Sequence, residues 1–229
     1  MHLHLCRVIL QCLSCSTLVT MYSSREHNQL KFCVSGAAET AHCGLKAFDK
    51  GKALGHEIAR QGAMLVTGAT TGFPMWSAIG AKEAGGFSLG FSPAPSEKEH
   101  IEVYNLPVDF MDVIVYTGFG FPGRDLILMR SSDAILFGCG RIGTIHEFTI
   151  AFEDEKPIGI LESEWETDEV IKTILKNAHR GGKERIVFDP DPKALVERVM
   201  ELVVNDRAHR AQMYLKKPDP FFQQKSPAA

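Results

Sequence analysis

The feature that most restricts the fold is the alternation of short apolar runs with longer segments of helical periodicity between residues 30 and 204. The apolar runs predict strands at 30–38, 63–67, 87–91, 113–116, 134–137, 157–161 and 185–188. Between them, apolar residues at helical spacing predict helices at 45–61, 74–85, 124–131, 144–155, 167–179 and 192–204, while 92–107 is expected to be a long loop or a short helix. Short apolar strands that alternate with helices form parallel sheets covered on both faces. The predicted fold class is α/β, a single Rossmann-like domain with a parallel sheet of about six or seven strands and helices on both faces.

The chain of 229 residues is long enough for one large domain with a full core, and nothing in it resembles an interdomain linker. We place the Rossmann-like domain at residues 29–215. Residues 1–28 are predicted to be a leader outside the fold: the apolar stretch 3–20 contains Arg7, lacks a clear cleavage site and is too short and polar for a membrane span. Met21 would be a second possible start. Residues 216–229 are expected to be a flexible tail.

Charge and cysteine content restrict the partners and the compartment. The net charge is -3 and no long basic run occurs, so neither nucleic acid nor a membrane is expected as a partner. Six scattered cysteines predict a reduced, cytoplasmic protein rather than a disulfide framework. Cys12 and Cys15 form a lone CxxC without a second one, so no metal site is predicted, and no cofactor is expected.

Glycine and hydroxyl residues follow several of the predicted strands. In parallel α/β sheets, ligands bind beyond the carboxyl ends of the strands. One such position is Ser35-Gly36, and another is the segment Gly68–Phe73, GATTGF, in which Gly68, Thr70, Thr71 and Gly72 are candidate phosphate ligands. Threonines before a helix can also serve only as N-caps.

The sharpest segment is GCGRIGTIHE, residues 138–147, in which a strand runs into a glycine-rich turn and then into a helix. The free amides and the dipole of a helix N-terminus favour an anion. Gly140 and Gly143 would let a phosphate approach the backbone, Thr144 would add a hydroxyl, and Arg141 would either clamp the phosphate or lie on the surface.

Arg124 and Glu147 are the candidate catalytic residues. An arginine at the start of a predicted helix opposes the helix dipole, so Arg124 is expected to have an anionic partner. Glu147 either projects into the crevice as an acid, base or ribose ligand, or is only a dipole partner. Asp125 has the same dipole-favourable interpretation, and His100 is a weaker candidate for the site.

Other motif matches offer rival functions. Gly138–Gly143 also spells GxGxxG, with Glu162 after the next strand, so binding of NAD or FAD is a rival, although the motif comes late in the chain. The GxGxxG at 118–123 contains bulky residues that fit a phosphate cradle poorly. The GxSxG at 86–90 places Ser88 inside a strand, which disfavours a hydrolase nucleophile.

These residues resemble the Lonely Guy (LOG) family and its wider relatives, which include molybdenum-cofactor carrier proteins. The family signature PGGxGTxxE is matched in its second half by Gly143, Thr144 and Glu147, and the family's helix-opening arginine corresponds to Arg124. The segment GATTGFPM, 68–75, partly keeps an earlier glycine loop of the family. The resemblance covers roughly residues 30–203.

The resemblance implies an enzyme that cleaves the N-glycosidic bond of a nucleoside 5′-monophosphate and releases the base and ribose 5-phosphate, usually as a homodimer. Arg124 and Glu147 would take the catalytic positions, and the glycine loops would bind the phosphate. The chain departs from the family pattern at Cys139, Arg141, Ala69 and Thr70. These departures leave two alternatives open: a non-catalytic binder or carrier of a phosphorylated ligand, and a scaffold with a vestigial pocket.

Overall fold

A computed structural model describes residues 29–215, so the predicted leader and tail lie outside the described residues. Seven parallel strands form one sheet in the order β4-β3-β2-β1-β5-β6-β7. Their bounds are Lys31–Ser35 (β1), Met64–Thr67 (β2), Ser88–Ser92 (β3), Val113–Tyr116 (β4), Ala134–Phe137 (β5), Ile158–Leu161 (β6) and Ile186–Asp189 (β7). The predicted α/β fold class is therefore confirmed.

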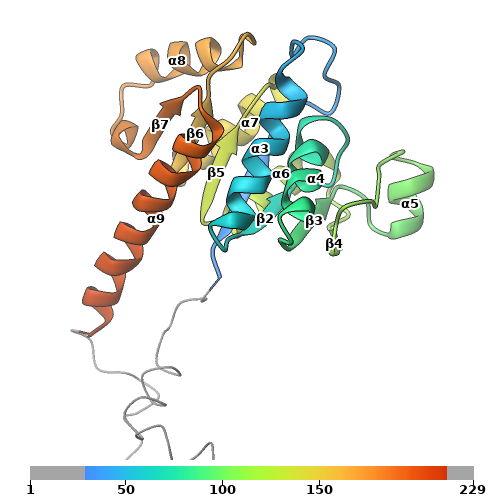
Figure 1. Cartoon of the computed structure of the whole chain (residues 1–229), viewed down its shortest axis with the longest axis horizontal. Helices are drawn as coiled ribbons and strands as arrows, with labels where there is room; N and C mark the ends of the chain where they lie inside the picture. Colours follow the sequence, from blue (N-terminus) through green and yellow to red (C-terminus); the bar gives the residue numbers. More distant parts are fainter. Residues whose placement is uncertain (1–28, 216–229) are drawn as a thin grey trace, which may run out of the picture.

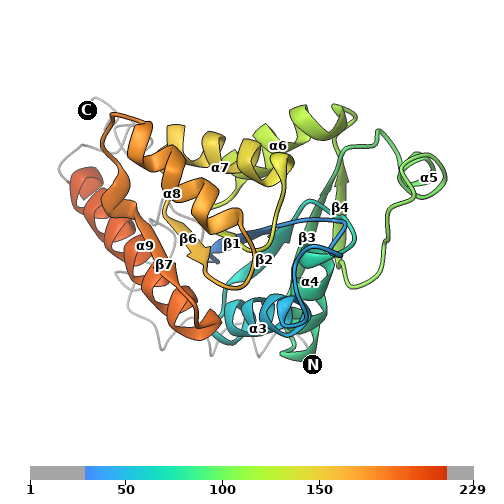
Figure 2. The same cartoon turned by 90° about the horizontal axis from the view of Figure 1, so that it is seen from above.

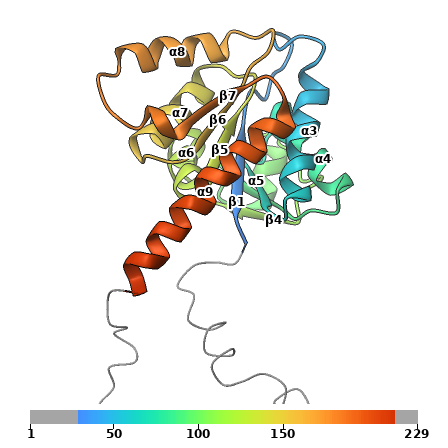
Figure 3. The ribbon, with the colours of Figure 1, turned by 60° about the vertical axis from the view of Figure 1, so that its left-hand side comes forward.

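Helices cover both faces of this sheet (Figures 1 and 2). They are α3 (Ala47–Arg60), α4 (Phe73–Glu83), α5 (Glu97–Glu102), α6 (Gly120–Ser131), α7 (Ile142–Glu153), α8 (Thr167–Asn177) and α9 (Pro192–Leu215). Figure 2 shows α3, α4 and α9 on one face and α6, α7 and α8 on the other, while α5 projects beside the edge strand β4. In Figure 3, α9 runs along β6 and β7 and continues past the sheet.

Each face of the sheet packs its own hydrophobic cluster, because successive side chains of a strand point in opposite directions. Phe32 and Val34 of β1 belong to the cluster under α3, α4 and α9. Cys33 lies between them in the chain and belongs to the cluster under α6, α7 and α8. A strand buried on both sides must be apolar at every position, which explains the continuous apolar runs in the sequence.

Three of the element boundaries that differ from the predicted ones affect helices near the site or the sheet edge. Helix α6 begins at Gly120, so Arg124 lies one turn inside it rather than at its start. Helix α7 begins at Ile142, which places Glu147 in the second turn. Helix α9 continues to Leu215 instead of ending near residue 204. For α6 and α7, the glycines near the helix start favour a loop in the sequence prediction. The backbone there is already helical, because packing overrides the low helix propensity of glycine.

One cysteine prediction is wrong. Cys43, in the loop after β1, and Cys139, in the loop after β5, form a disulfide with their Cα atoms 5.6 Å apart. The two residues are separated by 96 positions, so only the neighbouring positions of β1 and β5 bring them together. Cys33 is the free cysteine among residues 29–215. Within the same residues, no helix combines the length and apolar character needed to cross a bilayer.

The strand order places a crevice at β1 and β5. Strands β1 to β4 succeed one another toward one edge, and β5 to β7 succeed one another from β1 toward the other edge. The loops after β1 and β5 therefore leave the sheet in opposite directions, which opens a gap at their carboxyl ends. Ser35, the last residue of β1, pairs in register with Phe137, the last residue of β5.

Candidate functional site

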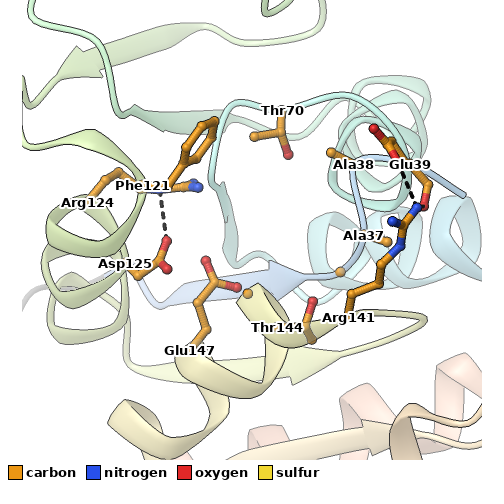
Figure 4. A pocket seen from close by; sticks show the side chains of 12 residues that line it. Ala37, Ala38, Glu39, Thr70, Phe121, Arg124, Asp125, Arg141, Thr144 and Glu147 are labelled. Atoms are coloured by element: carbon orange, nitrogen blue, oxygen red, sulfur yellow. Dashed lines mark hydrogen bonds and ion pairs between the residues drawn. The ribbon is translucent and has the colours of Figure 1, made fainter. Parts of the chain in front are cut away.

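A pocket of about 330 Å³ opens at this crevice (Figure 4). That volume lies within the range of about 300–1,000 Å³ that small-molecule sites span. Its lining comes from the loops after β1 and β2 and from the first turns of α6 and α7. The lining residues are Gly36, Ala37, Ala38, Glu39, Thr70, Phe121, Arg124, Asp125, Arg141, Gly143, Thr144 and Glu147.

Glu147 carries a buried carboxyl group that faces the pocket between Asp125 and Thr144 (Figure 4). The Ser35 hydroxyl donates a hydrogen bond to Glu147 Oε2. Burial raises the pKa of Glu147 to about 7, because a charge is poorly solvated there. The positive charge of Arg124 and the Ser35 hydrogen bond oppose this rise in pKa, and the neighbouring carboxylate of Asp125 reinforces it. Near neutral pH, Glu147 can therefore exist in both protonation states.

Arg124 is the buried cation of the pocket. Its Nη1 donates to the Phe91 carbonyl at 3.4 Å, and its Nε lies 3.1 Å from Asp125 Oδ1 in an ion pair. The geometry of that pair is not that of a hydrogen bond, so Nε is a buried donor without a hydrogen-bond partner in the part of the chain described. An unsatisfied buried donor costs free energy, which the ion pair with Asp125 partly offsets.

Gly68 explains how the guanidinium fits against the sheet. A Cβ at this position would overlap with Nη1 and Cζ of Arg124, and the three heavy atoms nearest to it all belong to that side chain. The glycine that follows β2 thus makes room for the arginine.

Asp125 lies between Arg124 and the more exposed His146 and contacts both. Its Oδ1 faces Arg124, and its Oδ2 lies 2.9 Å from Nδ1 of His146 on α7. Asp125 itself is buried, whereas His146 is half-exposed. The three residues tie α6 to α7 and hold the side chain of Arg124 in place.

The N-terminal turn of α7 has one position open to an anion and two groups that already have partners within the protein. A Cβ on Gly143 would meet no atom within 4 Å, so its backbone faces open space beside Thr144. The amide of Gly140, however, already donates to Thr167 Oγ1 at 2.7 Å. Arg141 Nη2 reaches Glu39 Oε2 at 2.8 Å across the opening of the pocket (Figure 4).

The structure brings most of the predicted site residues together, but not all of them line the pocket. Ser35 donates a hydrogen bond to Glu147, and Gly68 leaves room for the Arg124 side chain, but neither lines the pocket itself. Thr71 donates to the Ala38 carbonyl at 3.1 Å, and Gly72 packs against the same loop with a φ of 69°. The predicted residues that do line the pocket are Gly36, Thr70, Arg124, Arg141, Gly143, Thr144 and Glu147.

Several residues that line the pocket were not among the predicted site residues. Ala37, Ala38 and Glu39 follow β1 directly, and their place after a central strand was the available signal. Phe121 is bulky for a phosphate cradle, but its ring forms a wall of the pocket. Asp125 is predicted only as a dipole partner, because its contact with His146 of α7 depends on residues 21 positions away.

The rival motifs are explained by packing. A Cβ on Gly138 would overlap with the Phe73 ring, so this glycine of the GxGxxG match allows the ring to pack against the backbone in the core. Ser88 donates to the Phe110 carbonyl and lies buried inside β3. His100 is buried between Ser92 Oγ at 2.8 Å and the Pro107 carbonyl at 2.9 Å, so it holds the α5 loop.

The raised pKa of Glu147 makes stability depend on pH. In the unfolded chain this carboxyl ionises near 4.5, and in the folded protein near 7. Between these values the unfolded state loses its proton first, so rising pH favours unfolding through this group. We expect Glu147→Gln to be more stable than the wild type above pH 7, by about 3 kcal/mol. The difference should shrink as the pH falls toward 4.5.

Urea unfolding from pH 4.5 to 8 measures this difference. Glu201→Gln, at an exposed position of α9, is the matched control because it removes the same charge without burial. A constant offset between wild type and Glu147→Gln over the whole range would contradict the assignment of the titration to Glu147.

Comparison with solved structures finds the same fold in molybdenum-cofactor proteins. A molybdenum cofactor binding protein of Rippkaea orientalis is 23% identical, with a TM-score of 0.66 over 78% of this chain and 99% of that chain. The molybdenum cofactor carrier protein of Chlamydomonas reinhardtii is 24% identical, with a TM-score of 0.62 over 77% of this chain and 99% of the other. An uncharacterized protein of Archaeoglobus fulgidus is 29% identical over 133 residues, which are 58% of this chain and 82% of that protein.

The model of the SLOG cluster4 family matches residues 29–196, which include every strand of the sheet and every residue of the pocket. This match confirms the resemblance to the LOG family and its molybdenum-cofactor carrier relatives. The chain belongs to the SLOG cluster4 family.

Proposed function

We propose that this protein is a phosphoribohydrolase that cleaves the N-glycosidic bond of a nucleoside 5′-monophosphate. The observation that carries the proposal is that one pocket holds both a buried arginine, Arg124, and a buried carboxyl group, Glu147, whose pKa is about 7. The molybdenum-cofactor proteins that share this fold support a small phosphorylated ligand for this pocket.

The phosphate would lie against the N-terminal turn of α7. Gly143 leaves the backbone open to an anion, and the hydroxyl of Thr144 lies beside it. Arg141 stands at the opening and can exchange its exposed partner Glu39 for the phosphate. The sugar would then extend toward Arg124 and Glu147 at the other end of the pocket (Figure 4).

Bond cleavage would place positive charge on the sugar. As the bond to the base breaks, the ionised carboxylate of Glu147 would stabilise the oxocarbenium-like carbon and orient the attacking water. Burial strengthens this interaction because few water molecules screen it. Arg124 would compensate anionic groups of the substrate, and the aromatic wall formed by Phe121 would contact the base.

Incubation with AMP, GMP, CMP and IMP, followed by chromatography for free base and ribose 5-phosphate, tests the proposal. We expect release of base from at least one of them, in equal amounts with ribose 5-phosphate. Binding of these nucleotides without release of base from any of them would contradict the hydrolase.

The position of the phosphate can be tested separately with Gly143→Ala. The added methyl group meets no protein atom, and alanine favours a helix more than glycine does, so we expect the unliganded protein to gain roughly 0.5 kcal/mol. A phosphate on the adjacent amides would collide with the methyl group, so nucleotide affinity should fall about tenfold. Thermal shift with and without nucleotide measures both effects, and unchanged affinity would place the phosphate elsewhere.

A second candidate, a carrier that binds a phosphorylated ligand such as a pterin cofactor without cleaving it, is favoured by a specific observation. The Gly140 amide is already occupied by Thr167, and Arg141 replaces a family glycine and closes part of the opening through Glu39. Both features suit retention of a ligand more than rapid turnover. Native mass spectrometry of freshly purified protein distinguishes the two, because a carrier retains a phosphorylated compound and a hydrolase does not.

The homodimer implied by the resemblance stays a prediction, as does the cytoplasmic location. Apolar side chains are exposed on β4 and at the start of α6, at Val113, Val115, Phe119 and Phe121. Because Phe121 also lines the pocket, a second copy on this surface would complete the pocket wall.

A further inference from the structure

Beside the pocket described above, three side chains with metal-binding atoms converge. Cys43 and Cys139 join the loops after β1 and β5, and the imidazole of His42 turns toward both sulfur atoms. His42 Nε2 lies 3.5 Å from Cys139 Sγ and 3.8 Å from Cys43 Sγ.

These separations match those between ligands of one tetrahedral ion. With a Zn–S bond of about 2.3 Å and a Zn–N bond of about 2.05 Å, a tetrahedral angle separates nitrogen from sulfur by about 3.6 Å. Two thiolates on the same ion would lie about 3.8 Å apart. The Cα atoms of the cysteines, 5.6 Å apart, allow that spacing after rotation of the side chains once the S–S bond is open.

The cluster also has an entry route. Both cysteines are buried, but His42 is exposed and lines a second pocket of about 510 Å³. Glu164 and Trp165 form the wall of that pocket on the side of the loop after β6. An ion can therefore reach the sulfur atoms past the imidazole without passing through the hydrophobic core.

We propose that, with both cysteines as thiols, Cys43, Cys139 and His42 bind one thiophilic divalent cation of the Zn²⁺ class. A dithiol reductant supplies two electrons and two protons to open the Cys43–Cys139 bond and becomes a disulfide itself. The cation then displaces the two thiol protons and binds two thiolates and His42 Nε2, with water in the fourth position. Oxidation removes both sulfur ligands, so the disulfide and the metal site exclude each other.

Arg141 gives the proposal a directional test. Its Nε donates to His42 Nδ1 at 3.4 Å. When Nε2 binds a metal, the neutral imidazole carries its proton on Nδ1, so two donors would face each other across that contact. Arg141→Ala should therefore strengthen metal binding, whereas the loss of a merely structural contact would weaken it or leave it unchanged.

The experiment uses the full chain with Cys6, Cys12 and Cys15 replaced by serine, so that the CxxC near the N-terminus cannot bind metal. The protein is reduced with a phosphine, which becomes the phosphine oxide, and thiols are counted before Co²⁺ is titrated as a spectroscopic probe for Zn²⁺. We expect one Co²⁺ per chain, a thiolate-to-cobalt charge-transfer band, and displacement of Co²⁺ by Zn²⁺.

Variants assign the ligands. His42→Ala, at an exposed position, should weaken binding at least tenfold while leaving the melting temperature of the metal-free protein unchanged. Cys139→Ser should remove the charge-transfer band, and Cys33→Ser, at the buried free cysteine, should retain it. No band in the reduced parent protein, a disulfide that resists the phosphine, or a band unaffected by Cys139→Ser would each overturn the proposal.

Discussion

We expect the Glu147→Gln protein to release base from a nucleoside monophosphate about 10²–10⁴-fold more slowly than the wild type. The amide keeps the shape of the side chain and can still accept the Ser35 hydrogen bond, but it cannot carry the negative charge that the transition state requires. Nucleotide affinity should change less than threefold, because the phosphate binds at the other end of the pocket. Turnover and equilibrium binding, measured on the same preparation, separate these effects.

The pH profile provides the matching control. In the wild type, turnover should rise with pH through about 7, because burial raises the pKa of Glu147 to about that value and the carboxyl group ionises only above it. Glu201→Gln should keep both the rate and the profile, since this residue is exposed on α9. A Glu147→Gln protein that retained wild-type turnover would contradict the assigned role. The same ionisation that activates the site costs folding free energy, a common conflict between stability and activity.

The second large effect should come from Gly68→Ala, a change at a residue that does not itself line the pocket. The new Cβ would occupy the position of the Arg124 guanidinium, and the end of a flexible side chain can move where backbone cannot. We expect the fold to persist and nucleotide affinity to fall about 10–100-fold, because the displaced guanidinium no longer lines the pocket. Isothermal titration with the nucleotide that the wild type hydrolyses measures the loss.

Two comparisons make this result specific. Gly181→Ala adds a methyl group at a position with no atom within 4 Å and should leave affinity unchanged. Arg124→Lys keeps the charge but removes Nε and the planar fork, so it should reproduce the Gly68→Ala loss. It also preserves a cation beside the buried Asp125, which a truncation to alanine would leave unpaired. Wild-type affinity in Gly68→Ala would show that the position of Arg124 is unimportant.

Much of the fold follows from local pattern. The continuous apolar runs of β1 and β5 predict strands buried on both faces, and their alternation with amphipathic helices predicts a parallel sheet. The same logic places Glu147 and Thr144 at the carboxyl edge, because the chain must turn there between a strand and a helix. These features depend on a few neighbouring residues, so the sequence carries them directly.

The contacts that create the site depend on residues far apart in the chain. Ser35 meets Glu147 across 112 positions, and Cys43 meets Cys139 across 96, because β1 and β5 are neighbours in the sheet. No local periodicity encodes which strands become neighbours. The tertiary structure therefore decided that Gly68 makes room for Arg124, and that Thr167 occupies the Gly140 amide.

One physical reason separates the features determined by the sequence from those decided by the tertiary structure. Side-chain periodicity, glycine placement and helix-terminal residues act over one or two turns, so the sequence by itself determined the elements, their order and the edge where a ligand would bind. Burial, hydrogen-bond pairing and the raised pKa of Glu147 arise only when distant segments exclude water from one another. Those properties, on which the chemistry of the pocket depends, were decided by the packing of α6 and α7 against β1 and β5.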